Sequence, residues 1–322
     1  MKFQRLAAAL IMLASIWTSA QAKYPQETKN AALRYWMAFA EMQDMAADKA
    51  TQDLLEKTAA GEAAWDETKL APILDANVDA IQIMQRATKL PECDWGLEYS
   101  RGPRASIAYA PRARVLARLN TLEGMRQMAR GDSQSAVNAW LAGVHFSQDL
   151  ARGGTLIFAL MAKSAVLPNL RALTGAARNG QLNETERSKV LKAVRALPED
   201  GLDWGSAWAM ESATVEQILH ELQTAANPSA TYEATMGSPA PKQGLPPTAQ
   251  EIQVYREYML AVQAALREPP LKARSTLNEL ETKRRSLGEV EQEVTPSTQK
   301  SNAARIEIMT ARAELLQALG AK

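Results

Sequence analysis

Residues 122–150 decide the fold class and read LEGMRQMARGDSQSAVNAWLAGVHFSQDL. Apolar residues recur every three or four positions on both sides of Gly131-Asp132, a spacing that places them on one face of an α-helix. Glycine typically ends one helix, and aspartate typically begins the next. The stretch therefore predicts a helical hairpin, with Ala136 four residues after Asp132 as in a tetratricopeptide unit.

The same helical periodicity continues along most of the chain. Helix-forming residues dominate, and no stretch rich in Val, Ile and Thr alternates with period two, so strands are not expected. The sequence predicts an all-α protein. Because the hairpin period does not recur regularly, the expected architecture is an irregular α-solenoid or a helical bundle of helix hairpins.

Capping residues and apolar spacing predict individual helices. The first is expected over about 27–45, with an inward apolar stripe made by Leu33, Trp36, Met37 and Ala40. A single helix is expected from a cap at Asp66 to about Gln85. The other expected starts are Asp48, Asn183 with Glu186 as a capping box, Asp203 and Ser301.

Composition divides the chain after its first 22 residues into three parts. Residues 23–226 are expected to form a helical, tetratricopeptide-like domain, and 249–322 a set of C-terminal helices that form a hairpin or small bundle. Residues 227–248, rich in Pro, Gly and Ser, are typical of a flexible linker or surface loop. Within the first domain, residues 155–173 are apolar almost all round, which predicts a central buried helix because Lys163 and Pro168 argue against a membrane span.

The first 22 residues predict export. Lys2 and Arg5 precede an apolar run over 6–17, and Ala20-Gln21-Ala22 supplies small residues at the spacing that a signal peptidase accepts. We expect a protein that starts at Lys23 and is soluble in the periplasm or outside the cell. Cys93 is the only cysteine, so no disulfide within the chain is possible.

Charge is nearly balanced, with 37 Lys and Arg against 36 Asp and Glu, which argues against general nucleic-acid binding. One asymmetry stands out, because residues 99–130 hold seven arginines and one acid, Glu123. This segment predicts a basic face that binds an acidic polymer, a lipid headgroup or a protein. The alternative is a solvated face paired with acidic neighbours. The candidate binding residues are Arg112, Arg114, Arg118, Arg126 and Arg130.

Catalytic motifs do not emerge from the sequence. Two histidines and one cysteine do not provide ordinary zinc or haem ligand spacing, and no phosphate loop or serine elbow appears, so neither a metal nor a cofactor is expected. His145 and Asp149 have the spacing of a general-base pair or of a plain helix-surface pair. Glu211-Ser212 superficially matches the acid of lytic transglycosylases, without their downstream motifs. Cys93 is interpreted as a packed thiol.

Several short motifs occur in a recognisable order. They are residues 30–36 (NAALRYW), residues 93–96 (CDWG), Arg130-Gly131-Asp132 with Ala136, and residues 303–319. Together they resemble an uncharacterised group of predicted exported bacterial helical proteins. This resemblance implies a helical fold and brings no catalytic residue with it.

These observations favour a non-enzymatic exported protein that serves as an interaction or scaffold module of the cell envelope. Its partner would be a protein or envelope component bound through a helical surface, and not a nucleic acid. We expect no membrane-spanning segment in the exported chain. One alternative is a helical shell around an apolar ligand. The other is an enzyme that cleaves the cell wall.

Overall fold

The structure, a computed structural model, describes residues 27–43, 48–104, 107 and 109–321. The expected leader at 1–22 lies outside these residues. The described chain is all-α, as the sequence predicts, and its only β-type pairing is an isolated bridge between Asn30 and Glu92. The helices are α2 (Ala31–Glu41), α3 (Lys49–Ala60), α4 (Glu67–Asp75), α5 (Val78–Ala87), the 3-10 helix η1 (Tyr99–Arg104), α6 (Ala110–Ala129), α7 (Ser133–Ala151), α8 (Leu156–Arg178), α9 (Glu184–Ala196), α10 (Trp204–Thr224), α11 (Pro228–Met236), α12 (Ala249–Leu266), α13 (Pro270–Arg284), α14 (Glu289–Val294) and α15 (Thr298–Ala318).

The hairpin that the sequence predicts is formed by α6 and α7. Gly131 adopts a left-handed conformation with φ of 83°, and the Asp132 side chain caps α7 by accepting from the Ser135 amide at 2.9 Å. The two helices approach closely where Gly124 faces the buried indole of Trp140. A methyl group at Gly124 would come within 2.2 Å of Trp140 Nε1, so this glycine sets the distance between the helices.

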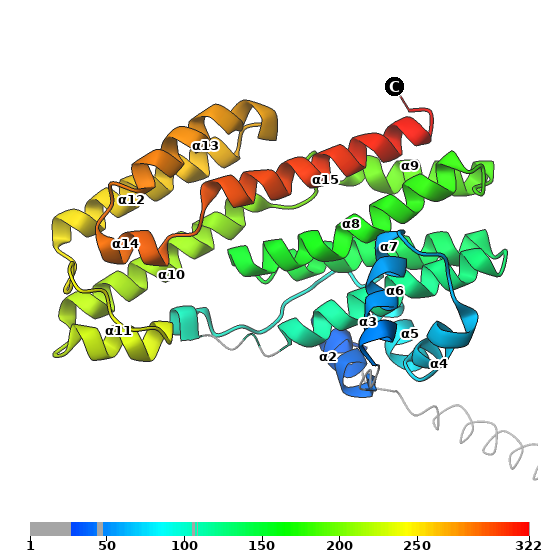
Figure 1. Cartoon of the computed structure of the whole chain (residues 1–322), viewed down its shortest axis with the longest axis horizontal. Helices are drawn as coiled ribbons and strands as arrows, with labels where there is room; N and C mark the ends of the chain where they lie inside the picture. The colour runs from blue at the N-terminus through cyan, green and yellow to red at the C-terminus, as the bar shows by residue number, and fades with distance from the viewer. Residues whose placement is uncertain (1–26, 44–47, 105–106, 108, 322) are drawn as a thin grey trace, which may run out of the picture.

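Helix α8 lies in the middle of the molecule and packs against α6, α7, α10 and α15 (Figure 1). Among the described helices it alone has the length and apolar composition that a membrane crossing requires, and 67% of its most apolar stretch is buried inside the protein. This burial fits the central core helix expected over 155–173. Gly143 of α7 meets Asn169 of α8 so closely that a Cβ there would lie 2.5 Å from the amide nitrogen.

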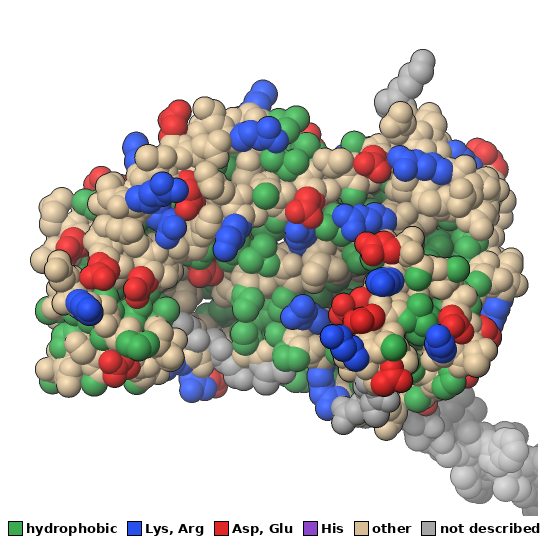
Figure 2. All heavy atoms as spheres, viewed as in Figure 1, with side chains coloured by type: hydrophobic (Ala, Val, Ile, Leu, Met, Phe, Trp, Pro, Cys, Tyr) green, Lys and Arg blue, Asp and Glu red, His purple; other side chains and the backbone are tan. Residues whose placement is uncertain are grey.

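The C-terminal helices pack on the rest of the chain through α15. Figure 1 shows α15 running beside α8 from α14 at one end to the C-terminus near α9. Arg305, only 2% exposed, joins three segments, because it contacts Asp200 at 2.7 Å and donates to the carbonyls of Leu266 and Glu268 at 3.0 and 2.7 Å. On the face drawn in Figure 2, basic and acidic side chains are interspersed, and hydrophobic ones gather in a hollow near the centre.

The apolar stripe expected on the first helix faces outward, so this prediction is wrong. Leu33, Trp36 and Met37 are 53%, 41% and 48% exposed. The helix instead buries Tyr35 and Phe39 together with Ala31, Ala32 and Ala38. Both faces of α2 carry apolar residues, and the aromatic contacts decide between them, since the Tyr35 ring lies 5.5 Å from Trp95 and 4.7 Å from Phe146.

Three other expected elements also differ. The single helix from Asp66 is two helices, α4 and α5, because the side chain of Asn77 donates to the Ile73 carbonyl and accepts from the Gln43 amide, both at 2.9 Å. Helix α15 begins earlier than expected, with Ser297 as its cap and Ser301 inside its first turn. Residues 227–248 contain α11, which Asn227 caps and Gly237 ends in a left-handed conformation.

Candidate functional site

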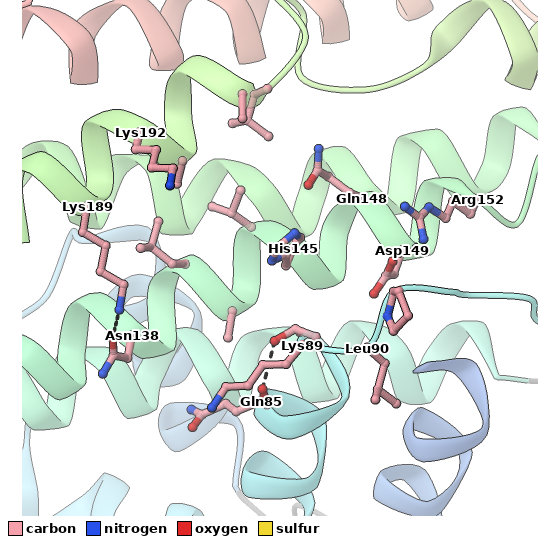
Figure 3. A pocket seen from close by; sticks show the side chains of 18 residues that line it. Gln85, Lys89, Leu90, Asn138, His145, Gln148, Asp149, Arg152, Lys189 and Lys192 are labelled. Carbon is pink, nitrogen blue, oxygen red and sulfur yellow. Dashed lines mark hydrogen bonds and ion pairs between the residues drawn. The ribbon is translucent and has the colours of Figure 1, made fainter. Parts of the chain in front are cut away.

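A groove of about 920 Å³ lies between the end of α5, one face of α7 and α9 (Figure 3). The α5 end and the following loop contribute Gln85, Thr88, Lys89, Leu90 and Pro91. Helix α7 contributes Asn138, Leu141, Ala142, Val144, His145, Gln148 and Asp149, followed by its C-cap residue Arg152, and the α9 side contributes Lys189, Lys192, Ala193, Ala196 and Leu197.

The walls of the groove are held by hydrogen bonds between helices. Glu186 completes the predicted capping box with Asn183 at the start of α9, and its carboxylate also accepts from the Ser133 hydroxyl at the start of α7, at 2.8 Å. On the other side, Gln85 donates to the Asn120 side chain at 2.9 Å, and Asn120 donates to the Ala139 carbonyl at 2.8 Å. Both walls are therefore tied to the α6–α7 hairpin.

Asp149 is a buried carboxylate at one end of the groove. It accepts from the Tyr35 hydroxyl at 2.5 Å and pairs with Arg152 at 3.3 Å, while its backbone carbonyl accepts from the Trp95 indole at 2.8 Å. Burial raises the pKa of Asp149 above its ordinary value, opposed in part by the Tyr35 hydrogen bond and the charge of Arg152. Both oxygens of Asp149 thus have hydrogen-bond or ion-pair partners other than His145, whose charge acts on the carboxyl as a smaller influence.

The lining of the groove is strongly basic. Lys89, Arg152, Lys189 and Lys192 surround it, and Asp149 is its one acidic residue, which leaves three net positive charges among these side chains. Figure 3 shows these cations entering from three segments, namely the α5 end, the α7 end and α9. Lys189 donates to Asn138, whereas Lys89 and Lys192 form no ion pair within the described residues. Between the cations, α7 and α9 present Leu141, Ala142, Ala193 and Ala196, so a basic rim surrounds a partly apolar floor.

Three of the five arginines predicted as a basic face form ion pairs with acidic side chains. Arg118 pairs with Glu56 at 3.1 Å, and Arg130 pairs with Glu67 at 2.5 Å. Arg126 is nearly buried between Asp75 and Glu123, each at 2.6 Å. These contacts correspond to the alternative in which the arginines pair with acidic neighbours.

The other two candidate binding residues, Arg112 and Arg114, form no ion pair among the described residues. Arg112 donates to the Phe39 carbonyl at 2.5 Å and so anchors α6 to the end of α2. Arg114 is exposed and forms no ion pair with any described residue. It lies beside Arg118 on the side of α6 that faces α3 and α8.

The residues weighed for catalysis also have structural partners. Burial raises the pKa of the Cys93 thiol to about 12, helped by the nearby charge of Asp149, which is the reverse of what activates a nucleophile. Glu211 accepts from the Leu156 amide at the start of α8 at 3.3 Å, and burial raises the pKa of its carboxyl. No three His, Cys, Asp or Glu side chains gather as a possible metal site among the described residues.

Sequence reasoning missed the groove because its cations come from separate segments. Lys89, Arg152 and the two α9 lysines stand far apart in the sequence, and only the fold brings them together. One local signal was present. Asn138, Leu141, His145, Gln148 and Arg152 recur at helical spacing as a second, mostly polar face at α7, which a buried hairpin does not need for its own packing.

Comparison of the chain with protein-family models, with curated proteins and with solved structures finds no match.

Proposed function

We propose that the groove binds an acidic segment of another cell-envelope protein, so that the chain serves as an exported interaction module. The observation that carries this proposal is the basic rim of Lys89, Arg152, Lys189 and Lys192 around a partly apolar floor on α7 and α9. A cationic groove attracts a ligand of opposite charge and disfavours a basic one.

A peptide segment fits this groove better than a uniformly charged polymer does. Leu141, Ala142, Ala193 and Ala196 lie between the cations, and apolar side chains of a peptide would leave water on contact with them. Acidic side chains on the same peptide would reach Lys89 and Lys192, whose charges have no carboxylate partner within the described residues. The expected ligand therefore combines Asp or Glu with Leu, Ile or Phe, as in the helix-in-groove mode of recognition.

Two features of the sequence support an exported protein that binds a partner through a helical surface. The leader expected at 1–22 favours a partner in the periplasm or outside the cell. The α6–α7 hairpin, which resembles a tetratricopeptide unit in sequence, carries α7 as the floor of the groove, and helical hairpins commonly present such concave binding surfaces.

The direct test measures fluorescence anisotropy of labelled acidic-apolar peptides with the chain purified without residues 1–22. We expect saturable binding that Lys89→Glu with Lys192→Glu weakens at least about tenfold, and that rising salt weakens because charge attraction is screened. The matched control is Lys272→Glu with Arg274→Glu on α13, two exposed cations outside the groove. Binding that both double variants reduce equally, or that neither reduces, would contradict the proposal.

A further inference from the structure

A second hollow, of about 260 Å³, lies between α3, α6 and α8. We call it the arginine pocket, because Arg114 and Arg118 of α6 and Arg171 of α8 line it. Its other lining residues are Glu56, Ala59 and Ala60 of α3, Ala117 and Thr121 of α6, and Ser164, Ala165 and Pro168 of α8. It shares no residue with the groove between α5, α7 and α9.

The charges in the arginine pocket are unbalanced. Three arginines and one acid, Glu56, line it, and Glu56 pairs with Arg118 at 3.1 Å. Arg114 and Arg171 are exposed and form no ion pair with a described residue. Like charges gathered around one hollow repel one another, so an anion placed between them would be bound favourably.

The remaining lining leaves space and offers the ligand no competing charge. Small side chains at Ala59, Ala60, Ala117 and Ala165 make the pocket concave. The two hydroxyl groups already donate to backbone carbonyls of their own helices, Thr121 to Ala117 at 3.0 Å and Ser164 to Met161 at 2.7 Å. The guanidinium groups of Arg114 and Arg171 are therefore the main donors left for a ligand.

We propose that the arginine pocket binds a phosphate group. Guanidinium forks match phosphate oxygens with paired hydrogen bonds, and a phosphate can accept from several sides at once, which suits arginines that approach from α6 and α8. A pocket of about 260 Å³ has room for a phosphate group. The phosphate belongs either to a soluble monoester or to a lipid headgroup, and the binding chemistry is the same for both.

The test titrates inorganic phosphate and glycerol 3-phosphate into the chain by isothermal calorimetry, at constant ionic strength with chloride as the reference anion. We expect saturable binding that Arg114→Gln with Arg171→Gln weakens at least about tenfold. Arg274→Gln on α13, an exposed arginine with no ion pair among the described residues, is the control and is expected to change nothing. Both substituted arginines are on the surface, and circular dichroism verifies that the variant is folded.

A second arm distinguishes the two sources of phosphate. Flotation with vesicles of phosphatidic acid in phosphatidylcholine retains the wild-type chain if a headgroup is the ligand, and the double variant is then released. If the soluble phosphates bind and the vesicles do not, the ligand is a soluble monoester. The proposal is overturned if neither phosphate nor vesicles bind, or if the double variant binds as the wild type does.

Discussion

Gly124 and Gly175 provide a matched test of the helix packing beneath the groove, because both glycines lie inside long helices and differ in what surrounds them. Replacing a glycine in a helix by alanine stabilises the helix by about 1 kcal/mol through propensity alone. At Gly175 in α8 a new Cβ would meet nothing within 4 Å. We therefore expect Gly175→Ala to raise the free energy of unfolding by about 1 kcal/mol.

At Gly124 in α6 the same methyl group would lie 2.2 Å from Nε1 and 2.5 Å from Cδ1 of Trp140. The indole is 1% exposed and donates to the Thr121 carbonyl at 3.2 Å, so it has little freedom to move. Overpacking of a buried site costs about 1–3 kcal/mol, and this contact belongs at the upper end of that range. After the gain of about 1 kcal/mol in helix propensity, Gly124→Ala should lower the free energy of unfolding by about 2 kcal/mol.

Urea denaturation of the two variants and of the wild type, followed by circular dichroism, measures both changes. The predicted outcome is opposite signs and a separation of about 3 kcal/mol between the variants, with equal denaturant dependence. If Gly124→Ala proves as stable as Gly175→Ala, α6 and α7 do not approach as described, and the position of the groove floor would have to be revised.

Three further predictions concern buried groups. Arg305→Met leaves Asp200 without its ion-pair partner and should destabilise the fold by about 3–5 kcal/mol. Arg178→Met removes an exposed pair with Glu314 and should cost less than about 1 kcal/mol. Urea denaturation of both variants measures the difference. Burial raises the pKa of the Glu211 carboxyl, so the contribution of this group to stability falls as the pH rises through its folded-state pKa. Glu211→Gln should therefore stabilise the protein more at pH about 7.5 than at about 4. A wall-lytic activity lost in this variant would favour the enzyme alternative. Because burial raises the pKa of Cys93 to about 12, iodoacetamide should label it slowly at pH about 8 in the folded chain and rapidly in urea, and equal rates would contradict its packed position.

Local capping chemistry made much of the fold predictable. Asp66, Asp132, Asn183 and Asp203 all begin helices with their side chains accepting from the backbone, because this interaction involves residues only three positions apart. The start of α11 carries the same kind of signal in Asn227-Pro228. The density of proline and glycine around it led instead to the expectation of a linker or loop.

Features that depend on distant contacts were not predictable. The buried face of α2 is decided by Trp95, Phe146 and Asp149, which lie far along the chain from Tyr35. The break between α4 and α5 depends on the contact of Asn77 with Gln43. The spacing of apolar residues shows which faces of a helix are apolar. It does not show which of two apolar faces packs against the rest of the protein.

The candidate site was also not predictable, because it depends on contacts between residues that lie far apart in the sequence. A local excess of arginine drew attention to residues 99–130, yet Arg126 and Arg130 pair with acids that precede this segment in the chain. The groove gathers basic residues from separate segments of the chain, such as Lys89 and Lys192. Net charge around a hollow is a property of the tertiary structure, and a count along the chain does not supply it.

Photo-crosslinking from inside the groove tests the central proposal most directly. A benzoylphenylalanine in place of Gln148, which lines the groove on α7, would be irradiated in envelope extract from the source cells, and the crosslinked peptides identified by mass spectrometry. We predict one discrete acidic-apolar segment of a partner protein, lost when Lys89→Glu and Lys192→Glu are added and retained with Lys272→Glu and Arg274→Glu. Crosslinks that survive the groove substitutions, or none at all, would contradict a function in binding acidic protein segments.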